Sequence, residues 1–547
     1  MARLVKRVKS GFTLSYFFPL AGVLVPLFVG TFYFPQASYV SNVVTKLLIL
    51  SVAPILVVLG LFSSKRWGKI GFPRNLVIVF SAFISYLIFR ALITGSLWKG
   101  LTGTSDRNLG IITYLMFFLF AWIGYQLTES TTPKTLAHLI TLLGVGEATI
   151  VNYQYFISDN SNAITGTFYN SNPVSFLLGI IVASLFAFLL YERKRGRGEY
   201  LVLVLSLLWM LLALFVCGSQ QGLITFALIV VLLVVTKLIR ALRINLSKLL
   251  FPTFLMALST FISIAFVMPI KDNTQIGSNA ILERLEIYKS ALKLFVQYPI
   301  FGVGIDSFQE KYGHVTLTIA MELVDNAHSI PLHILSTIGF VGFAMWLIVI
   351  FLVLSKGKSA VNEEQPEYKF FQIGFFSYLL VGIVGIEHPV IGATSWLMAG
   401  ALIKISSAQL VEKKSQNSKL DSRKLGTRSV LAGSVSLILT SLFLLPQQIV
   451  VGRALSDFSE RRLTNSEFDA VIDVNLNRIW NPALLLIMGQ AYIAIDQQAD
   501  ALVIANAMLK NYPDDQRTSI LLFAIANKWN DEKAQGLAEE VRDRIFK

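Results

Sequence analysis

Charged residues are scarce in this sequence. They make up 15% of the 547 residues, against about 25% in soluble proteins, while apolar residues make up 54%. A soluble fold cannot bury so many apolar side chains, so a purely soluble protein is excluded. We predict an all-α protein with many membrane-spanning helices, each of which uses about 20 apolar residues.

Cysteine is nearly absent as well. Cys217 is the single cysteine, so a disulfide within the chain is impossible. The sequence has no HExxH motif, no cysteine and histidine set with zinc spacing, and no DxD motif. We therefore expect no metal and no cofactor, and an enzyme that clamps a nucleotide sugar through a DxD-bound metal is disfavoured.

Acidic residues are outnumbered by basic ones, 33 to 47, which gives a net charge of +14. The basic residues cluster in short loops between apolar runs, and no basic stripe carries interleaved aromatic residues. This placement is typical of membrane topology and not of nucleic-acid binding. We predict no nucleic-acid partner.

Thirteen apolar runs have the length of membrane spans. The first follows the basic stretch MARLVKRVKSG and is longer than the core of a cleavable signal peptide, so we interpret it as a retained signal anchor. The runs cover residues 12–34, 42–62, 76–94, 109–127, 135–157, 173–191, 200–217, 223–239, 249–270, 329–354, 370–386, 394–410 and 429–449.

Every second loop between these runs is basic, which places those loops in the cytoplasm. Because the number of runs is odd, we expect a multi-pass protein of the cytoplasmic membrane with its amino terminus inside and its carboxyl terminus outside. The basic loop residues are Lys65, Arg66, Lys69, Arg74, Arg193, Lys194, Arg195, Arg197, Arg240, Arg243, Lys248, Lys413, Lys414, Lys419, Arg423, Lys424 and Arg428.

Two large polar segments then fall on the outer side: the loop 271–326 and a hydrophilic tail. We divide the chain into a membrane domain, residues 1–450, and an outer domain, residues 451–547. Chemistry outside the membrane has no supply of ATP or nucleotide sugars, so its substrate must arrive already activated. This favours a lipid-carried donor.

The tail shows the spacing of a helical repeat. Asn481 and Pro482 are typical of a helix start. The residues that follow fit a tetratricopeptide-like (TPR-like) repeat, with degenerate neighbours at about 455–480 and 515–547. The alternative is a plain helical hairpin that caps the membrane domain. The residues that fit the repeat are Leu485, Met488, Gly489, Tyr492, Ala501 and Pro513.

The outer loop begins with an amphipathic helix. Ser278 and Asn279 are candidate caps for a helix that runs to Gln297, stops before Pro299 and carries Arg284 in its first turn. We expect this helix to lie at the membrane interface, with one face formed by Leu285, Tyr288, Leu292 and Phe295.

A polar cluster follows at the start of the tenth span. Asp325, Asn326 and Ser329 surround His328, whose neutral imidazole is available at physiological pH. A helix cap or an interface residue is the alternative role for this histidine. His333 lies off its face and is interpreted as structural, and His314 has no obvious partner.

Several motifs occur in a fixed order along the outer side. They are Gly-Thr-Phe-Tyr-Asn-Ser-Asn-Pro at 166–173, Arg284 with its helix, Pro299 with Gly302, Gly304 and Phe308, Asn326-Ala-His328-Ser, and Gly339-Phe-Val-Gly342. In this order, over about residues 100–410, the chain resembles the O-antigen ligase and O-antigen polymerase superfamily. That superfamily also includes oligosaccharyltransferases that glycosylate proteins.

The resemblance implies a GT-C-like, metal-independent glycosyltransferase that takes a glycan from undecaprenyl diphosphate. It implies that His328 activates the acceptor hydroxyl and that Arg284 engages the diphosphate. A positioned base helps because a sugar hydroxyl ionises only as the new bond forms. A guanidinium helps because it can hold the leaving diphosphate with two parallel hydrogen bonds.

Further polar residues of the outer turns are candidates for binding the diphosphate or the glycan. We give His388, in the last outer turn, a place among them because it can face the same region as His328. The candidates are Asn170, Asn172, Gln220, Gln221, Asn326 and His388.

One departure from the family concerns the turn 217–222, where a basic residue is usual. Gln220 and Gln221 bring no charge there. Arg90, inside the third apolar run, is the natural substitute. A charged side chain inside a membrane span is energetically costly, so its presence there indicates a function. Snorkelling of Arg90 to the interface is the alternative. Glu147, in the fifth run, could pair with Arg90 or with His138.

Two classes of function therefore remain. The first is a ligase-like glycosyltransferase, with a polymerase or a protein O-glycosylase as variants that differ in the acceptor. The second is a transporter of lipid-linked sugars, which would show paired halves with broken helices at matching positions. The sequence shows no such repeat, which favours the enzyme. The tail is a candidate site for a protein or polysaccharide partner.

Overall fold

The regular secondary structure of the computed structural model consists of helices alone in the part of the chain that it describes. It describes residues 14–32, 42–63, 72–94, 97–104, 107, 109–130, 132–157, 164–168, 170–192, 196–241, 276–312, 324–356, 365–412, 482–513 and 515–546. The helices of the larger body are α2 (Leu14–Thr31), α3 (Asn42–Ser63), α4 (Arg74–Ile93), α5 (Leu97–Thr102), α6 (Ile111–Ser130), α7 (Pro133–Ile157), α8 (Ser171–Tyr191), α9 (Arg197–Val216), α10 (Gln221–Ala241), α12 (Ile276–Gln297), α13 (Phe308–Tyr312), α14 (Ile330–Lys356), α15 (Pro366–Gly382) and α16 (Pro389–Glu412). The carboxyl-terminal helices are α19 (Pro482–Ala494), α20 (Gln498–Asn511), α21 (Gln516–Trp529) and α22 (Glu532–Phe546).

The apolar runs form helices wherever they fall in the described residues. Seven of these helices, α4, α6, α7, α8, α9, α14 and α16, are long and apolar enough to cross a membrane. This confirms a helical, multi-pass membrane protein. The predicted runs at 249–270 and 429–449 lie outside the described residues, as do the basic amino-terminal stretch, His314 and the repeat predicted at 455–480.

Glycine lets the central helices approach closely. A Cβ on Gly124 of α6 would lie 2.0 Å from the carbonyl oxygen of Leu397 on α16, and one on Gly400 of α16 would lie 1.7 Å from the carbonyl oxygen of Ala121. Neither gap admits a side chain. Small residues play this part in membranes because helices there associate by close packing and not by the hydrophobic effect.

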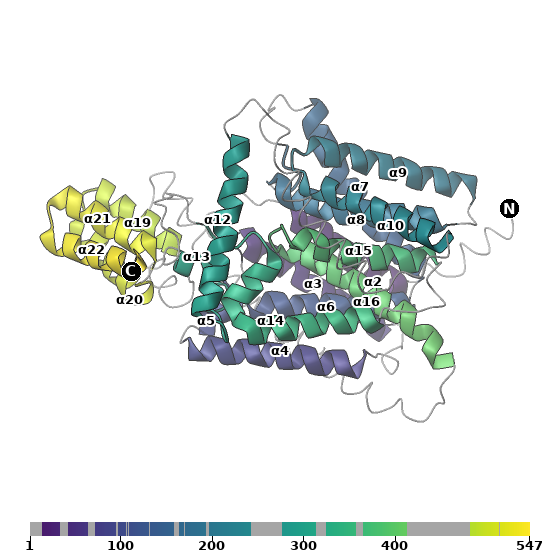
Figure 1. Cartoon of the computed structure of the whole chain (residues 1–547), viewed down its shortest axis with the longest axis horizontal. Helices are drawn as coiled ribbons and strands as arrows, with labels where there is room; N and C mark the ends of the chain where they lie inside the picture. Colours follow the sequence, from purple (N-terminus) through teal and green to yellow (C-terminus); the bar gives the residue numbers. More distant parts are fainter. Residues whose placement is uncertain are drawn as a thin grey trace.

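Helix α12 lies across the end of the bundle, perpendicular to α4, α6 and α14 (Figure 1). The predicted amphipathic helix is confirmed, although it begins at Ile276, so the predicted cap falls inside it. Its buried stripe is formed by Ile287, Ala291 and Leu294. Leu292, predicted for the apolar face, lies outside this stripe and is 47% exposed.

Helix α14 is broken where the segment after α12 packs against it. Gly339 has φ +70° and ψ −174°, which interrupts the helix. The backbone groups left free at the break are paired with the segment 299–304: the Val303 and Gly304 N–H groups donate to the Ser336 and Thr337 carbonyls at 3.0 and 2.9 Å. Irregular backbone at membrane depth is tolerated only when it is satisfied in this way.

Two glycines make this junction possible. A Cβ on Gly302 would lie 2.4 Å from the Thr337 carbonyl oxygen, and one on Gly339 would lie 2.4 Å from the Ile300 carbonyl oxygen. Both glycines also have positive φ. The glycines at 302 and 339, both part of the family-like motifs, therefore lie in one contact, the joint between the segment 299–304 and α14.

Helix α4 fastens the joint from the other side. Arg90 Nη2 donates to the Gly302 carbonyl oxygen at 3.1 Å, and its guanidinium lies 5.4 Å from the centre of the Phe301 ring. The Tyr86 hydroxyl donates to the Ile338 carbonyl oxygen at 2.6 Å. The predicted candidate Arg90 is thus engaged with the protein backbone, and its exposed fraction is 6%.

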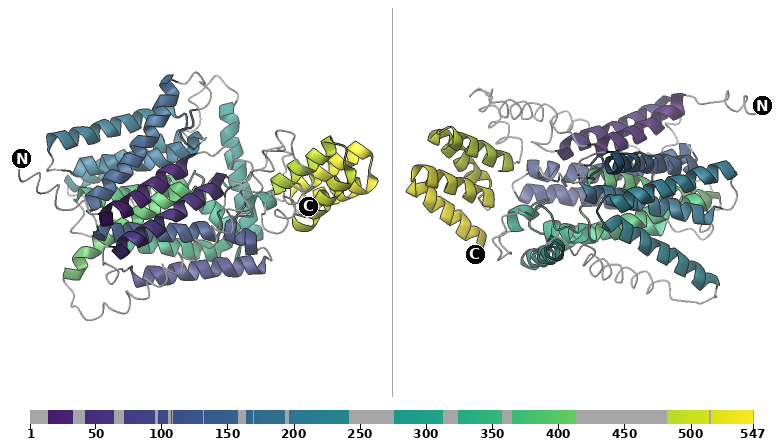
Figure 2. Two further views of the ribbon diagram at one scale, coloured as in Figure 1. Left: turned by 180° about the vertical axis from the view of Figure 1, so that it is seen from behind. Right: turned by 90° about the horizontal axis from the view of Figure 1, so that it is seen from above.

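The four carboxyl-terminal helices lie beyond the end of the bundle that carries α5, α12 and α13 (Figures 1 and 2). The residues Leu485, Met488, Tyr492 and Ala501, which fit the predicted repeat, are all buried in their core. Gly489 faces Leu521, whose Cδ1 would lie 2.5 Å from an added Cβ. The region 515–546, which has a degenerate sequence, is a regular pair of helices, α21 and α22.

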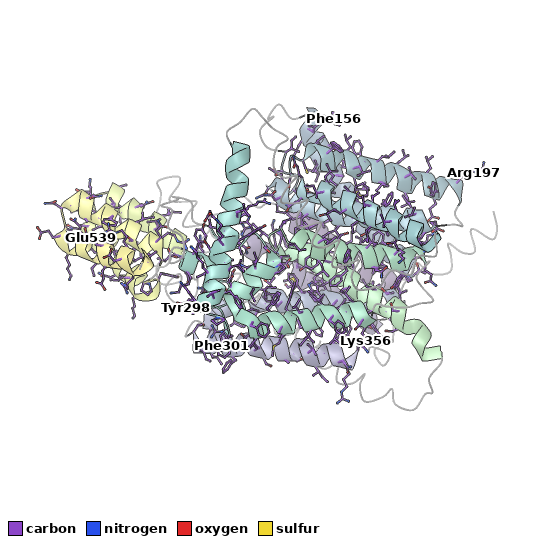
Figure 3. All side chains as sticks on the ribbon, in the orientation of Figure 1. Phe156, Arg197, Tyr298, Phe301, Lys356 and Glu539 are labelled. Atoms are coloured by element: carbon purple, nitrogen blue, oxygen red, sulfur yellow. The ribbon has the colours of Figure 1, made fainter. Side chains whose placement is uncertain are left out.

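The opposite ends of the bundle differ in their side chains. Arg197 and Lys356 lie at one end, and the aromatic residues Tyr298 and Phe301 lie at the other, on the side of α12 (Figure 3). Tyr298 and Phe301 are 46% and 43% exposed. Exposed aromatic residues at one level of a membrane protein are typical of the interface with water.

Candidate active site at the start of α14

His328 lies in a tight turn that precedes α14. Its φ is +49°, and its N–H donates to the Asn326 side-chain oxygen at 3.1 Å. The Tyr288 hydroxyl, from α12, donates to the His328 carbonyl oxygen at 3.3 Å. Asn326 and Ala327 are buried. The turn therefore fixes the backbone of His328 from two sides, as asparagine does in turns of this kind.

Asn326 has a second feature of interest. Its amide nitrogen is buried and has no hydrogen-bond partner within the described residues. A buried donor without a partner is costly, so it marks a place where a bound group can complete the hydrogen bonding. Asn326 thus holds the His328 turn through its oxygen, while its nitrogen remains without a partner in the part of the chain that the structure describes.

Three charged residues act on the His328 imidazole. Burial, the Arg284 guanidinium and the Arg107 guanidinium lower its pKa, Asp325 opposes them, and the pKa comes to about 4. Two cations beside an imidazole disfavour its protonated form. The structure therefore brings the predicted residues Arg284 and His328 together and keeps the histidine neutral at physiological pH.

Arg107 is the residue that the sequence analysis missed. Its Nε lies 2.6 Å from Asp325 Oδ2, and the two side chains are 26% and 21% exposed. A signal was present in the sequence, because Lys99 and Arg107 both lie between the third and fourth runs, on the side where few basic residues are expected.

The segment that carries Arg107 is anchored by the loop before α13. Asp306 Oδ2 accepts hydrogen bonds from the Thr104 N–H at 2.6 Å, the Thr104 hydroxyl at 2.9 Å and the Leu109 N–H at 3.1 Å. Lys99 donates to Ser307 at 2.6 Å and pairs with Glu310.

His333 completes this anchor from α14. Its Nε2 lies 3.5 Å from Asp306 Oδ1, and both side chains are buried. This contact agrees with the structural role expected for His333. Together these contacts join the segment 97–109, the loop 304–310 and the first half of α14.

The turns before α8 and α10 are joined to each other. Asn170 caps α8 by accepting from the Asn172 N–H at 2.9 Å. Asn172 in turn accepts from the Ser219 hydroxyl and from Gln221 Nε2, both at 2.9 Å. Gln220 is exposed. Within the described residues, the interactions of Asn170, Asn172 and Gln221 hold these turns together, and Asn170 and Gln220 are exposed to solvent.

The motif at 166–173 is anchored on α7. Glu147 accepts from the Thr167 N–H at 2.9 Å and from its hydroxyl at 2.6 Å. A Cβ on Gly166, whose φ is +56°, would lie 2.1 Å from Glu147 Oε1. Glu147, for which the sequence left Arg90 or His138 as partners, thus holds this motif.

His388 lies in a second polar group, which contains Lys46 of α3. Lys46 Nζ lies 3.4 Å from His388 Nε2 and 5.1 Å from the centre of the Phe168 ring. The charges of Lys46 and Arg107 both act on the His388 imidazole. Arg107 therefore lies within electrostatic reach of both histidines. Lys46 was detectable as a lone lysine inside the second apolar run.

Metal binding is not suggested by the described residues, among which no three histidine, cysteine, aspartate or glutamate side chains form a group that could hold an ion. What the site offers is a neutral imidazole, two guanidinium groups and an unpaired amide donor. These groups suit proton abstraction from a hydroxyl beside an anionic leaving group.

Residues 163–347 match the family model of O-antigen ligase. The matched part contains Arg284, Asn326 and His328, whereas Arg107 and His388 lie outside it. No curated protein is significantly similar to the chain. The chain therefore carries an O-antigen ligase domain within a multi-pass membrane protein, and this match supports a membrane glycosyltransferase of the O-antigen ligase and polymerase type.

Proposed function

We propose that this protein transfers a glycan from undecaprenyl diphosphate to an acceptor hydroxyl at the outer face of the cytoplasmic membrane, without a metal ion. The observation that carries the proposal is the neutral His328 imidazole beside Arg284, next to the interface helix α12. A lipid-linked donor would present its diphosphate at this level, below its aqueous glycan. The acceptor of first choice is the lipid A core, as in a ligase.

The chemistry follows from these groups. The acceptor oxygen forms a bond to the anomeric carbon of the donor sugar while its proton passes to His328. The bond from that carbon to the diphosphate breaks, and its electron pair stays on the diphosphate oxygen. Arg284 stabilises the charge that gathers there.

We also propose the topology that goes with this function. The amino terminus lies in the cytoplasm, the membrane domain spans residues 1–450, and the domain 451–547 lies outside, where its TPR-like helices hold a polysaccharide or protein. A contact between the carboxyl-terminal helices and the membrane domain supports their place beside the site: Arg517 Nη2, on α21, donates to Gln309 of α13 at 3.2 Å.

Transfer in proteoliposomes tests the proposed function. We expect the purified protein to transfer the glycan of an undecaprenyl-diphosphate-linked oligosaccharide to one of three acceptors, supplied separately: the lipid A core, a second donor molecule or a protein. The acceptor that is glycosylated distinguishes ligase, polymerase and protein glycosylase. The absence of transfer to all three would contradict the proposal.

Arg284→Ala should lower kcat/KM for the donor by about 10- to 100-fold, the value of a lost hydrogen bond to a charged group. Arg284→Lys should recover only part of this, because an ammonium lacks the planar pair of donors. The matched control is Lys289→Ala, which removes an exposed cation from the same helix. Equal effects of Arg284→Ala and Lys289→Ala would contradict the role of Arg284.

The pH dependence of kcat/KM provides an independent check. A histidine base with an ordinary pKa would lose activity below about pH 6.5. His328, with its pKa lowered to about 4, stays in the neutral form across pH 5–8, so we expect kcat/KM to be flat there and to fall only near pH 4. The diphosphate stays ionised over this range. An acid limb at pH 6.5 or above would contradict the assignment.

A further inference from the structure

The ion pair between Arg107 and Asp325 leaves much of the guanidinium free. It joins Nε of Arg107 to Oδ2 of Asp325, whereas arginine and carboxylate commonly share two parallel hydrogen bonds. Within the described residues the Arg107 guanidinium makes no other hydrogen bond or ion pair. Its terminal nitrogens are therefore able to bind a second anion.

The neighbouring charges are placed differently. Asp306 and His333 are buried, and Asp306 accepts three hydrogen bonds from the segment 104–109. Lys99 is also buried, between Ser307 and Glu310. These residues form a buried, hydrogen-bonded network, whereas the side chains of Arg107 and Asp325 are partly exposed. Partly exposed ion pairs are weak, so an anion with two charges can displace the carboxylate.

The position of Asp325 gives such a displacement a chemical consequence. Asp325 precedes His328 by three residues, and its carboxylate already favours the protonated imidazole, against Arg284 and Arg107. Tyr288 on α12 contacts the backbone of the same turn, because its hydroxyl donates to the His328 carbonyl oxygen. While Arg107 pairs with Asp325, the two charges largely cancel at His328. A diphosphate on Arg107 would remove this cancellation.

We propose that Arg107 is a second diphosphate-binding residue and that Asp325, its partner in the free protein, is a positioning residue for His328. Donor binding then moves the Asp325 carboxylate from Arg107 to the imidazole. This inference rests on the proposed function and names the order of events in that site: the base is strengthened only after the donor has bound.

The step is balanced without any further reactant. The acceptor hydroxyl gives its proton to the His328 imidazole as its oxygen bonds to the anomeric carbon, and the diphosphate leaves with the electron pair of the broken bond. The imidazole becomes an imidazolium ion, whose charge the Asp325 carboxylate stabilises. Arg107 and Arg284 hold the diphosphate. Hydrolysis of the donor by stray water is disfavoured, because the base is weak until the donor is in place.

Opposite effects on donor affinity test this proposal. Asp325→Asn should lower kcat about 10- to 100-fold, because the imidazolium loses its counter-charge, and should lower the KM for the donor, because Arg107 is freed from its competitor. Arg107→Gln should instead raise the donor KM about 10-fold or more, and Arg107→Lys should restore part of the loss. The double variant should be non-additive, because each residue acts through the other.

Two controls separate this role from a structural one. Glu286→Gln removes a comparable ion pair on α12, Lys289 Nζ to Glu286 Oε1 at 2.6 Å, and should change neither constant. The acid limb of kcat, which reports the donor complex, should lie at higher pH than that of kcat/KM in the wild type, and this difference should shrink in Asp325→Asn.

The inference is overturned if Asp325→Asn and Arg107→Gln change the KM for the donor in the same direction, both raising it or both lowering it, while the wild type is active and His328→Ala is inactive. That result would make the ion pair a purely structural contact and leave the proposed function intact. If the wild type itself fails to use the lipid-linked donor, the proposed function fails first. Inorganic diphosphate, used as a competitor of the donor, measures anion binding at Arg107 directly. Inhibition by diphosphate should weaken in Arg107→Gln and strengthen in Asp325→Asn.

Discussion

Replacing His328 with alanine should lower the rate of glycan transfer by about 10²- to 10⁴-fold, the usual contribution of a positioned general base. The neutral imidazole beside Arg284 and Arg107 is the group in the described part of the site that is suited to accept the hydroxyl proton. The measurement is single-turnover transfer in proteoliposomes, which isolates the chemical step from product release.

The choice of variant matters because His328 has φ +49°. Alanine tolerates that conformation poorly, whereas asparagine adopts it more readily, so His328→Asn should fold better and be as inactive. His138→Ala is the matched control. It removes a histidine of α7 that lies 3.6 Å from Glu199, away from the site, and should leave transfer unchanged. Transfer near the wild-type rate by His328→Asn would refute the assignment of the base.

Replacing Gly339 with alanine should destabilise the protein by at least about 3 kcal/mol, which combines positive φ with a steric clash. An added Cβ would lie 2.4 Å from the Ile300 carbonyl oxygen and 2.5 Å from the Gly302 nitrogen. Neither backbone atom can move without breaking the hydrogen bonds that join the segment 299–304 to α14. Thermal unfolding in detergent and the yield of monodisperse protein provide the measurement.

Two other glycines separate the causes. Gly218 also has positive φ, +77°, but an added Cβ would meet nothing within 4 Å, so Gly218→Ala measures backbone strain alone. Gly196 has open space and no positive φ, so Gly196→Ala should be nearly neutral. We expect stability to fall in the order Gly196→Ala, Gly218→Ala, Gly339→Ala. Equal stability of the Gly218 and Gly339 variants would show that the close backbone packing of the joint contributes little.

Much of the candidate site could be proposed from local patterns in the sequence. A polar cluster at the start of an apolar run identified Asn326 and His328, and the amphipathic period identified the helix that carries Arg284. Arg107 was missed because its partner Asp325 lies 218 residues along the chain. The pairing of Arg90 with the Gly302 carbonyl, 212 residues away, was equally inaccessible. A cation in a span predicts that a partner exists, but not which one.

The sequence by itself determined that the chain is helical and crosses a membrane many times. The length of an apolar run is a local property, and the thickness of the bilayer and its lack of water require such a run to form a spanning helix. Through the order of its motifs it also indicated a candidate site beside the predicted amphipathic helix. Only the tertiary structure decided which groups each charged side chain contacts. It placed Arg90 on a backbone carbonyl and Arg107 beside His328, because the electrostatic state of a side chain depends on neighbours that long-range packing brings to it.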